Sequence, residues 1–205
     1  MDKFTKVTGV AAPLMRQNVD TDLVIRIERL VSNTGREGLG PYCFEQIRFK
    51  ADGSEDPDCV FNQAPYRGAP IILSADNFGC GSSREGAVWA LAGMGVKAVI
   101  APSYGDIFFN NCFQNGILPV KLPIEEVERL ADETRASPGN ARVTVDLENC
   151  QVISPTGRTI PFEVDGRRQH ALLNGLDDIA QTMTHKDAIA GWQGADRTAR
   201  PWVWL

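Results

Sequence analysis

The chain lacks the features that mark membrane and secreted proteins. Its 205 residues contain no apolar run approaching the roughly 18 residues of a membrane span, and its amino terminus lacks the long apolar segment of a secretory signal. We therefore expect a cytoplasmic protein with no membrane contact.

Positive charge is also scarce. The formal net charge is -5, with 21 Lys and Arg against 26 Asp and Glu. The densest basic groups, Arg167 with Arg168 and Arg197 with Arg200, are small and lie far apart. A nucleic-acid surface needs a concentrated positive face, so we expect no nucleic-acid partner.

Cysteine and histidine are too few and too dispersed for a metal framework. Five cysteines are an odd number, include no Cys-x-x-Cys pair, and are accompanied by only two histidines. This pattern is typical of reduced thiols and not of disulfides or a zinc site. The cysteine spacing gives no sign of an iron-sulfur cluster either, so we expect no metal or cofactor held by this chain.

What the chain does contain is an alternation of apolar runs and helical segments. The runs 71–73, 96–100 and 117–120 predict buried strands, and the intervening segments 85–94 and 104–115 predict helices. Such alternation favours a parallel sheet whose functional loops follow the carboxyl ends of the strands. The prediction is an α/β fold in a single domain over residues 1–205.

The flanking segments complete the prediction. Residues 4–14 predict one strand ending at Pro13, and the glycine-bearing stretch 31–40 predicts a mobile surface loop. Further elements are predicted as a short helix over 42–49, a helix over 124–135, an antiparallel meander over 142–147, 150–154 and 159–164, and helices over 167–173 and 176–192. The tryptophan-containing tail 194–205 is predicted to dock on this chain or on another.

The stretch Asn77-Phe78-Gly79-Cys80-Gly81-Ser82-Ser83-Arg84-Glu85 lies between a predicted strand and a predicted helix. Its glycines permit a tight turn, its serines can cap the first amides of a helix, and Arg84 carries a planar cationic fork. Backbone amides, hydroxyls and a guanidinium can converge there on a carboxylate or phosphate. We interpret this stretch as the active-site loop.

Several familiar motifs do not fit this stretch. It is not a Gly-x-Ser-x-Gly elbow, it lacks the lysine of a P-loop, and Gly79-x-Gly81 lacks the third glycine of a dinucleotide fingerprint. Considered singly, Ser82 and Ser83 are ordinary helix caps and Arg84 is an ordinary surface cation.

Taken together, four blocks resemble the small subunit of 3-isopropylmalate dehydratase, and more distantly the swivelling domain of aconitases. The first is the active-site stretch, followed by Trp89-Ala90-Leu91. The others are Asn18-Val19-Asp20-Thr21-Asp22, the stretch from Asp106-Ile107-Phe108 through Asn111-Cys112 to Asn115-Gly116-Ile117-Leu118-Pro119, and Leu172-Leu173-Asn174-Gly175-Leu176-Asp177-Asp178-Ile179.

The resemblance implies a β/β/α swivelling domain with a mainly parallel central sheet, an antiparallel meander and a helical C-terminus. It also implies a larger partner subunit, in a heterodimer or heterotetramer, that carries a [4Fe-4S] cluster. The implied reaction converts 2-isopropylmalate to 3-isopropylmalate through isopropylmaleate, in leucine biosynthesis. The substrate is thus a small dicarboxylate, and the cluster acts on its hydroxyl as a Lewis acid.

Site residues follow by position in the resembling blocks. Ser82 would be the catalytic base, held as an alkoxide by amides of the Gly81 to Arg84 turn, while Ser83 assists and Arg84 binds a substrate carboxylate. The resemblance gives Thr21 and Asp22 supporting roles, with a simple turn or cap as the alternative. Leu39 and Arg36 match a segment that distinguishes substituents, although singly each is an ordinary surface residue.

The sequence departs from the family pattern beside the loop. Gly86 stands where histidine is usual, Val88 where proline is common, and Leu23 and Arg26 replace glutamine and proline. These departures leave open a paralogue that acts on another substituted malate or maleate. They also leave open a non-catalytic anion-binding module that kept the fold.

Overall fold

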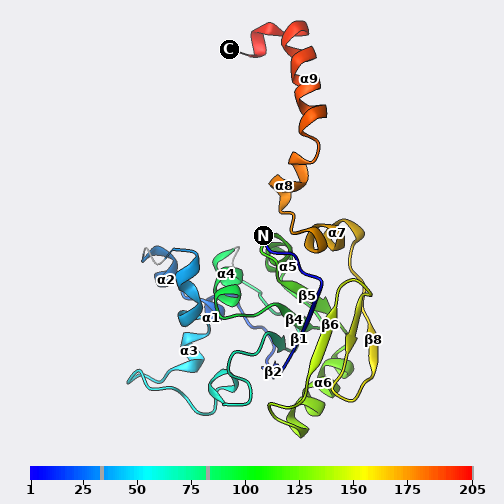
Figure 1. Ribbon diagram of the computed structural model, residues 1–205. Coiled ribbons are helices and arrows are strands. Elements are labelled where there is room, and N and C mark those ends of the chain that lie inside the picture. Colours follow the sequence, from blue (N-terminus) through cyan, green and yellow to red (C-terminus); the bar gives the residue numbers. More distant parts are fainter. Residues whose placement is uncertain (33–34, 82–83, 205) are drawn as a thin grey trace.

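Two four-stranded sheets organise the computed structural model, which describes residues 1–32, 35–81 and 84–204 (Figure 1). One sheet is parallel and consists, in spatial order, of β2 (Ala11–Pro13), β3 (Ile71–Leu73), β4 (Ala98–Ala101) and β5 (Leu118–Lys121). The parallel strands predicted from the three apolar runs are therefore confirmed.

The second sheet is antiparallel. It consists of β1 (Lys6–Gly9), β6 (Val143–Asp146), β7 (Gln151–Ile153) and β8 (Thr159–Pro161), and its last three strands are the predicted meander. The prediction of one strand over 4–14 is wrong, because β1 and β2 belong to different sheets with only Val10 between them. Where the chain changes sheets, a Cβ on Gly9 would lie 2.4 Å from Cγ of Pro70, so the approach admits no side chain.

Helices fill the connections between strands. The body contains α1 (Thr21–Val24), α2 (Ile27–Val31), the 3-10 helix η1 (Glu37–Tyr42), α3 (Glu45–Arg48), the 3-10 helix η2 (Val60–Asn62), α4 (Gly86–Gly93), α5 (Asp106–Gln114), α6 (Ile124–Ala136) and α7 (Gly166–Asn174). The break expected at Asn174-Gly175 is present, since Gly175 takes a left-handed φ of 69° and ends α7.

The parallel sheet is buried on both faces. Alternate residues of β3 point to opposite sides, so Ile72 packs in the cluster beneath α1 to α5, whereas Ile71 and Leu73 pack with α6 and the antiparallel sheet. Figure 1 shows this layering, with α1 to α4 on one side and α6, β6 and β8 on the other. The predicted α/β fold, with its parallel central sheet, meander and helical C-terminus, is confirmed.

The expected surface loop over 31–40 differs from the structure. Residues 37–42 form η1, which packs so closely on α4 that a Cβ on Gly40 would lie 2.2 Å from the backbone oxygen of Gly93. Leu39 is buried in the core. Of the glycines that predicted a loop, Gly40 serves instead for close packing of η1 on α4, and residues 33–34 lie outside the described part of the chain.

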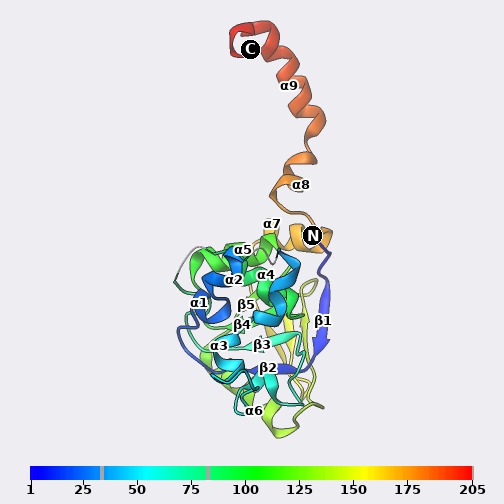
Figure 2. The same cartoon turned by 90° about the vertical axis from the view of Figure 1, so that its left-hand side faces the viewer.

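The C-terminal residues 178–204, here called the C-terminal arm, project from the body in both views (Figures 1 and 2). The arm contains α8 (Asp178–Met183), α9 (Lys186–Ala199) and the 3-10 helix η3 (Pro201–Val203). The helix predicted over 176–192 is therefore interrupted near His185, and its second half continues to Ala199. Trp204 folds back on α9 through a 2.8 Å hydrogen bond from its Nε1 to Oδ2 of Asp196.

Candidate active site

The turn that contains Gly79 and Cys80 is held on one side by the loop that follows β2. The amide of Gly79 donates to the oxygen of Val19 at 2.6 Å, and the amide of Thr21 donates to the oxygen of Cys80 at 2.9 Å. These bonds extend the parallel β2–β3 pairing past the strand ends, where Asp20 forms an isolated bridge with Cys80. The loop that we predicted to be the active-site loop therefore lies at the carboxyl ends of parallel strands.

The loop that follows β4 holds the other side of the turn. The amide of Gly105 donates to the oxygen of Phe78 at 2.9 Å, and the amide of Phe78 donates to the oxygen of Ser103 at 3.1 Å. A Cβ on Gly105 would lie 2.5 Å from the oxygen of Gly79, and one on Gly79 would lie 2.1 Å from Cγ of Phe108. Two glycines therefore let the start of α5 touch the turn directly.

Gly81 brings the turn back toward α1. Its φ of 92° favours glycine, and a Cβ there would lie 3.6 Å from Cβ of Asp20 and 3.8 Å from Oγ1 of Thr21. Asp20 itself caps α1, because its Oδ1 accepts from the amide of Leu23 at 2.6 Å. Thr21 is buried beside the turn, and its supporting role stays a prediction.

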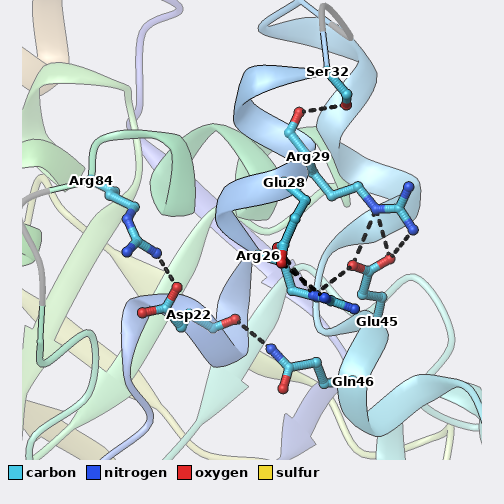
Figure 3. A network of polar contacts seen from close by, with 8 residues as sticks. All are labelled: Asp22, Arg26, Glu28, Arg29, Ser32, Glu45, Gln46 and Arg84. Atoms are coloured by element: carbon cyan, nitrogen blue, oxygen red, sulfur yellow. Dashed lines mark hydrogen bonds and ion pairs between the residues drawn. The ribbon is translucent and has the colours of Figure 1, made fainter.

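Arg84 lies at the end of the same loop and binds Asp22 (Figure 3). Its Nη1 donates to Oδ1 of Asp22, with the Arg84 side chain 25% exposed and the Asp22 side chain 53% exposed. The backbone oxygen of Asp22 accepts in turn from Nε2 of Gln46 at 3.0 Å, which ties α1 to α3. A guanidinium that already binds a carboxylate stands beside the glycine turn.

The two serines at the centre of the predicted site, Ser82 and Ser83, lie outside the described residues. The roles of Ser82 and Ser83 remain predictions.

The two predicted specificity residues occupy different surroundings. Arg36 lies over the ring of Trp89, 5.0 Å from its centroid, and donates through Nη2 to Oδ1 of Asn115. Leu39 is 2% exposed within the core that η1 shares with α4. Contact of either residue with a substrate substituent stays a prediction.

The unusual Gly86 has a packing reason. It is the first residue of α4 and buried, and a Cβ there would lie 2.4 Å from Cδ2 of Leu30 on α2. The end of the Leu30 side chain therefore occupies the space next to Gly86 and would have to move for a side chain at residue 86.

The cysteine within the turn is poorly suited to act as a nucleophile. Burial raises the pKa of the Cys80 thiol, and the neighbouring Asp20 charge raises this pKa further, so the thiol is protonated at neutral pH. Across residues 1–32, 35–81 and 84–204, no three His, Cys, Asp or Glu side chains are grouped so as to hold a metal ion. Within the same ranges, no helix is both long and apolar enough to cross a membrane.

Comparison with known proteins identifies the family of this chain. Residues 1–125 match the family model of the aconitase C-terminal domain, and residues 128–166 match the model described as LeuD_N. A curated protein of Gluconacetobacter diazotrophicus, named 3-isopropylmalate dehydratase small subunit, is 54% identical over 98% of this chain and 97% of its own length. The chain belongs to the 3-isopropylmalate dehydratase small-subunit family.

Two further relatives support the assignment to the 3-isopropylmalate dehydratase small-subunit family. A protein of that name from Paramagnetospirillum magneticum is 51% identical over 99% of this chain and all of its own length. The crystal structure of 3-isopropylmalate dehydratase (leuD) from Methanocaldococcus jannaschii matches with a TM-score of 0.66 and 25% identity, over 91% of this chain and 98% of that one. Members of the family are thus similar to this chain over nearly its whole length.

Sequence reasoning did not assign a role at the site to Gly105, Leu30 or the side chain of Asn115. Gly105 follows β4, the parallel neighbour of β3, so adjacency of the two strand-end loops was the available signal. Leu30 carried no such signal, because its contact with Gly86 joins two helices through tertiary packing.

Proposed function

We propose that this chain is the small subunit of a heteromeric hydro-lyase that isomerises 2-isopropylmalate to 3-isopropylmalate through isopropylmaleate, in leucine biosynthesis. The observation that carries the proposal is the Arg84 guanidinium, which binds the Asp22 carboxylate at the end of the glycine turn. Arginine has five N–H donors in a planar fork, so a carboxylate of the substrate can bind the same side chain.

The residues of this chain would perform the proton transfer and the carboxylate binding. Ser82 would remove the proton next to a carboxylate, Ser83 would support the resulting anion site, and backbone amides from Gly81 onward would hold the alkoxide. Because a serine hydroxyl is a weak acid, this chemistry requires a preorganised cationic pocket rich in amides, to which Arg84 contributes. Thr21 and Asp22 would support the turn and Arg84.

The substituent of the substrate would face the segment that contains Arg36 and Leu39. The [4Fe-4S] cluster, bound by the large subunit, would supply the Lewis acid for the substrate hydroxyl. We place the complex in the cytoplasm, where cysteines stay reduced, and all five cysteines of this chain are free.

The large subunit would also cover the C-terminal arm, as part of a heterodimer or heterotetramer. Within the arm, Trp192 is 60% and Trp202 is 68% exposed, which is unusual for tryptophan without a partner surface. The named small subunits align over 98% or more of this chain, so the arm belongs to the length that they share. In this proposal residues 1–205 act as one swivelling domain with the arm as its docking segment.

The test is anaerobic reconstitution with the large subunit of the same host, followed by an absorbance assay for the unsaturated intermediate. The wild-type complex should turn over 2-isopropylmalate, and Ser82→Ala should abolish turnover while the two subunits still copurify. Substantial activity of Ser82→Ala would contradict the assignment of the base.

The substrate panel decides between the alternatives. Turnover of citraconate or another alkylmaleate, without turnover of 2-isopropylmalate, would identify a paralogue with the same mechanism. An intact cluster with no turnover of any of these substrates would instead favour the anion-binding module.

A further inference from the structure

The side-chain amide of Asn115 takes part in four hydrogen bonds at the end of α5. Its Nδ2 donates to Oε1 of Glu85 at 2.8 Å and to the backbone oxygen of Asn111 at 2.8 Å. Its Oδ1 accepts from Nε1 of Trp89 at 3.1 Å and from Nη2 of Arg36. An amide group has two N–H donors and two lone pairs, so its capacity is filled.

Only one orientation of this amide satisfies its neighbours. Turning it over would set the NH₂ group against the N–H groups of Trp89 and Arg36, and the oxygen against Glu85 and a backbone carbonyl. Aspartate would keep the two accepted bonds but lose both donated ones, and would place a second carboxylate against Glu85. Asparagine is therefore the residue type that this junction requires.

The backbone also fixes Asn115. Its amide donates to the oxygen of Cys112 at 3.1 Å, and the amide of Ile117 donates to the same oxygen at 3.1 Å. Between them Gly116 takes a φ of 74°, a conformation suited to glycine at a helix end. The side chain thus extends from a fixed helix end that continues directly into β5.

The partners of Asn115 place it beside the proposed site. Glu85 immediately follows Arg84, and its backbone oxygen accepts from the amides of Val88 and Trp89 in the first turn of α4. Arg84 is tied to α1 through Asp22, whereas Glu85 is tied to α5 through Asn115. Two consecutive residues at the end of the active-site loop are therefore anchored to different elements.

We propose that Asn115 is a positioning residue, whose amide fixes Glu85 and Arg36 against the start of α4 and thereby sets the orientation of Arg84. This proposal rests on the proposed function, in which Arg84 binds a substrate carboxylate. Asn115 itself does not contact substrate, and its effect on binding passes through Arg84.

The first test is Asn115→Asp in the reconstituted complex. The change should raise KM for 2-isopropylmalate about tenfold, because a hydrogen bond to a charged group is lost. Combining it with Glu85→Gln should restore most of the loss, since the glutamine amide can donate to the new carboxylate. Asn110→Asp on the same helix is the matched control, because Oδ1 of exposed Asn110 accepts from Nη2 of Arg168 at 2.7 Å, and aspartate can do the same.

The second test separates positioning from general stability. In an Arg84→Lys background, Asn115→Asp should raise KM by much less than tenfold, because the residue through which it acts is already changed. An equal effect in both backgrounds, or failure of Glu85→Gln to rescue, would overturn the proposal.

A third measurement is independent of turnover and distinguishes failure of this proposal from failure of the proposed function. In the ¹⁵N-labelled full chain, Asn115→Asp should shift the Nε–H signal of Arg84, and adding Glu85→Gln should shift it back. An unmoved Arg84 signal would overturn the positioning role whatever the complex catalyses. A wild-type complex that turns over no dicarboxylate, with the Arg84 signal shifting as expected, would refute only the proposed function.

Discussion

Replacement of Gly105 by alanine tests whether contact between α5 and the glycine turn is required for activity. Gly105 has a φ of -63° and a ψ of 131°, a conformation open to any residue, so Gly105→Ala carries no backbone penalty. Its Cβ would meet the oxygen of Gly79 at 2.5 Å and Cα of Cys80 at 3.0 Å. Both obstacles are backbone atoms of the turn, so no rotamer change can relieve them.

The size of the effect follows from that distance. Ordinary contact begins near 3.4 Å, so the oxygen of Gly79 has to move by about 0.9 Å. Overpacking of this kind costs about 1 to 3 kcal/mol of unfolding free energy. Misplacement of a site by about 1 Å costs on the order of 100-fold in rate, so we expect kcat/KM to fall by about that factor.

The assays are urea unfolding of the isolated chain and turnover of 2-isopropylmalate by the reconstituted complex. Gly166→Ala is the control, because Gly166 is the first residue of α7, Gly105 directly precedes α5, and a Cβ on Gly166 would meet no atom within 4 Å. If Gly105→Ala matched Gly166→Ala in both assays, the turn would not depend on the close approach of α5.

Three further changes test other parts of the structure. Arg84→Lys should raise KM for 2-isopropylmalate about tenfold, because lysine lacks the planar fork, and an unchanged KM and kcat would refute a carboxylate clamp; exposed Arg135→Lys is the control. Burial raises the pKa of Asp146, but hydrogen bonds from Lys6 and Asn149 outweigh this effect, so the pKa lies below its ordinary value. The ionised carboxylate therefore contributes to the free energy of unfolding, and this contribution is lost as pH falls. Urea unfolding should show stability falling below about pH 4, and falling less steeply in Asp146→Asn. Gly86→His should lose about 1 to 3 kcal/mol through its clash with Leu30 and recover part of the loss with Leu30→Ala; equal unfolding midpoints for Gly86→His and wild type would contradict the packing account.

The parallel sheet could be predicted because each of its central strands is recognisable from its own local sequence. Ile71, Ile72 and Leu73 are consecutive and apolar, as a strand buried on both faces requires, and the same holds for the buried residues of β4. Glycines that follow the predicted strands then indicate where the chain turns. The position of the glycine turn at the end of β3 follows from this order alone.

The regions that differed depend on contacts between distant segments. Gly38 and Gly40 favour a loop locally, yet residues 37–42 form η1, in which Gly40 lies so close to the backbone of Gly93 that no side chain fits there. Likewise, nothing in residues 4–14 indicates that the chain changes sheets at Val10, because the choice depends on pairing with β6 and β3. Local pattern predicts the type of an element more readily than its partner.

The candidate site likewise has a part that the sequence predicted and a part that depends on contacts between distant segments. The resemblance placed Thr21, Asp22, Gly81 and Arg84 in one site, and the structure brings these four residues together around the turn. The anchoring of Glu85 by Asn115 joins residues 30 positions apart through side chains, which no local pattern reports.

The contact between Gly86 and Leu30 also bears on the substrate. Loss of the usual histidine would favour an altered pocket if it left space beside Arg84, but the space at residue 86 is occupied by Leu30. Leu30 comes from α2, which is tied to α3 by hydrogen bonds of 2.8 to 3.1 Å between Arg29 and Glu45 (Figure 3). The departure at residue 86 is thus compensated by packing from an anchored helix. Gly86 therefore leaves no open space where α4 meets Leu30 of α2.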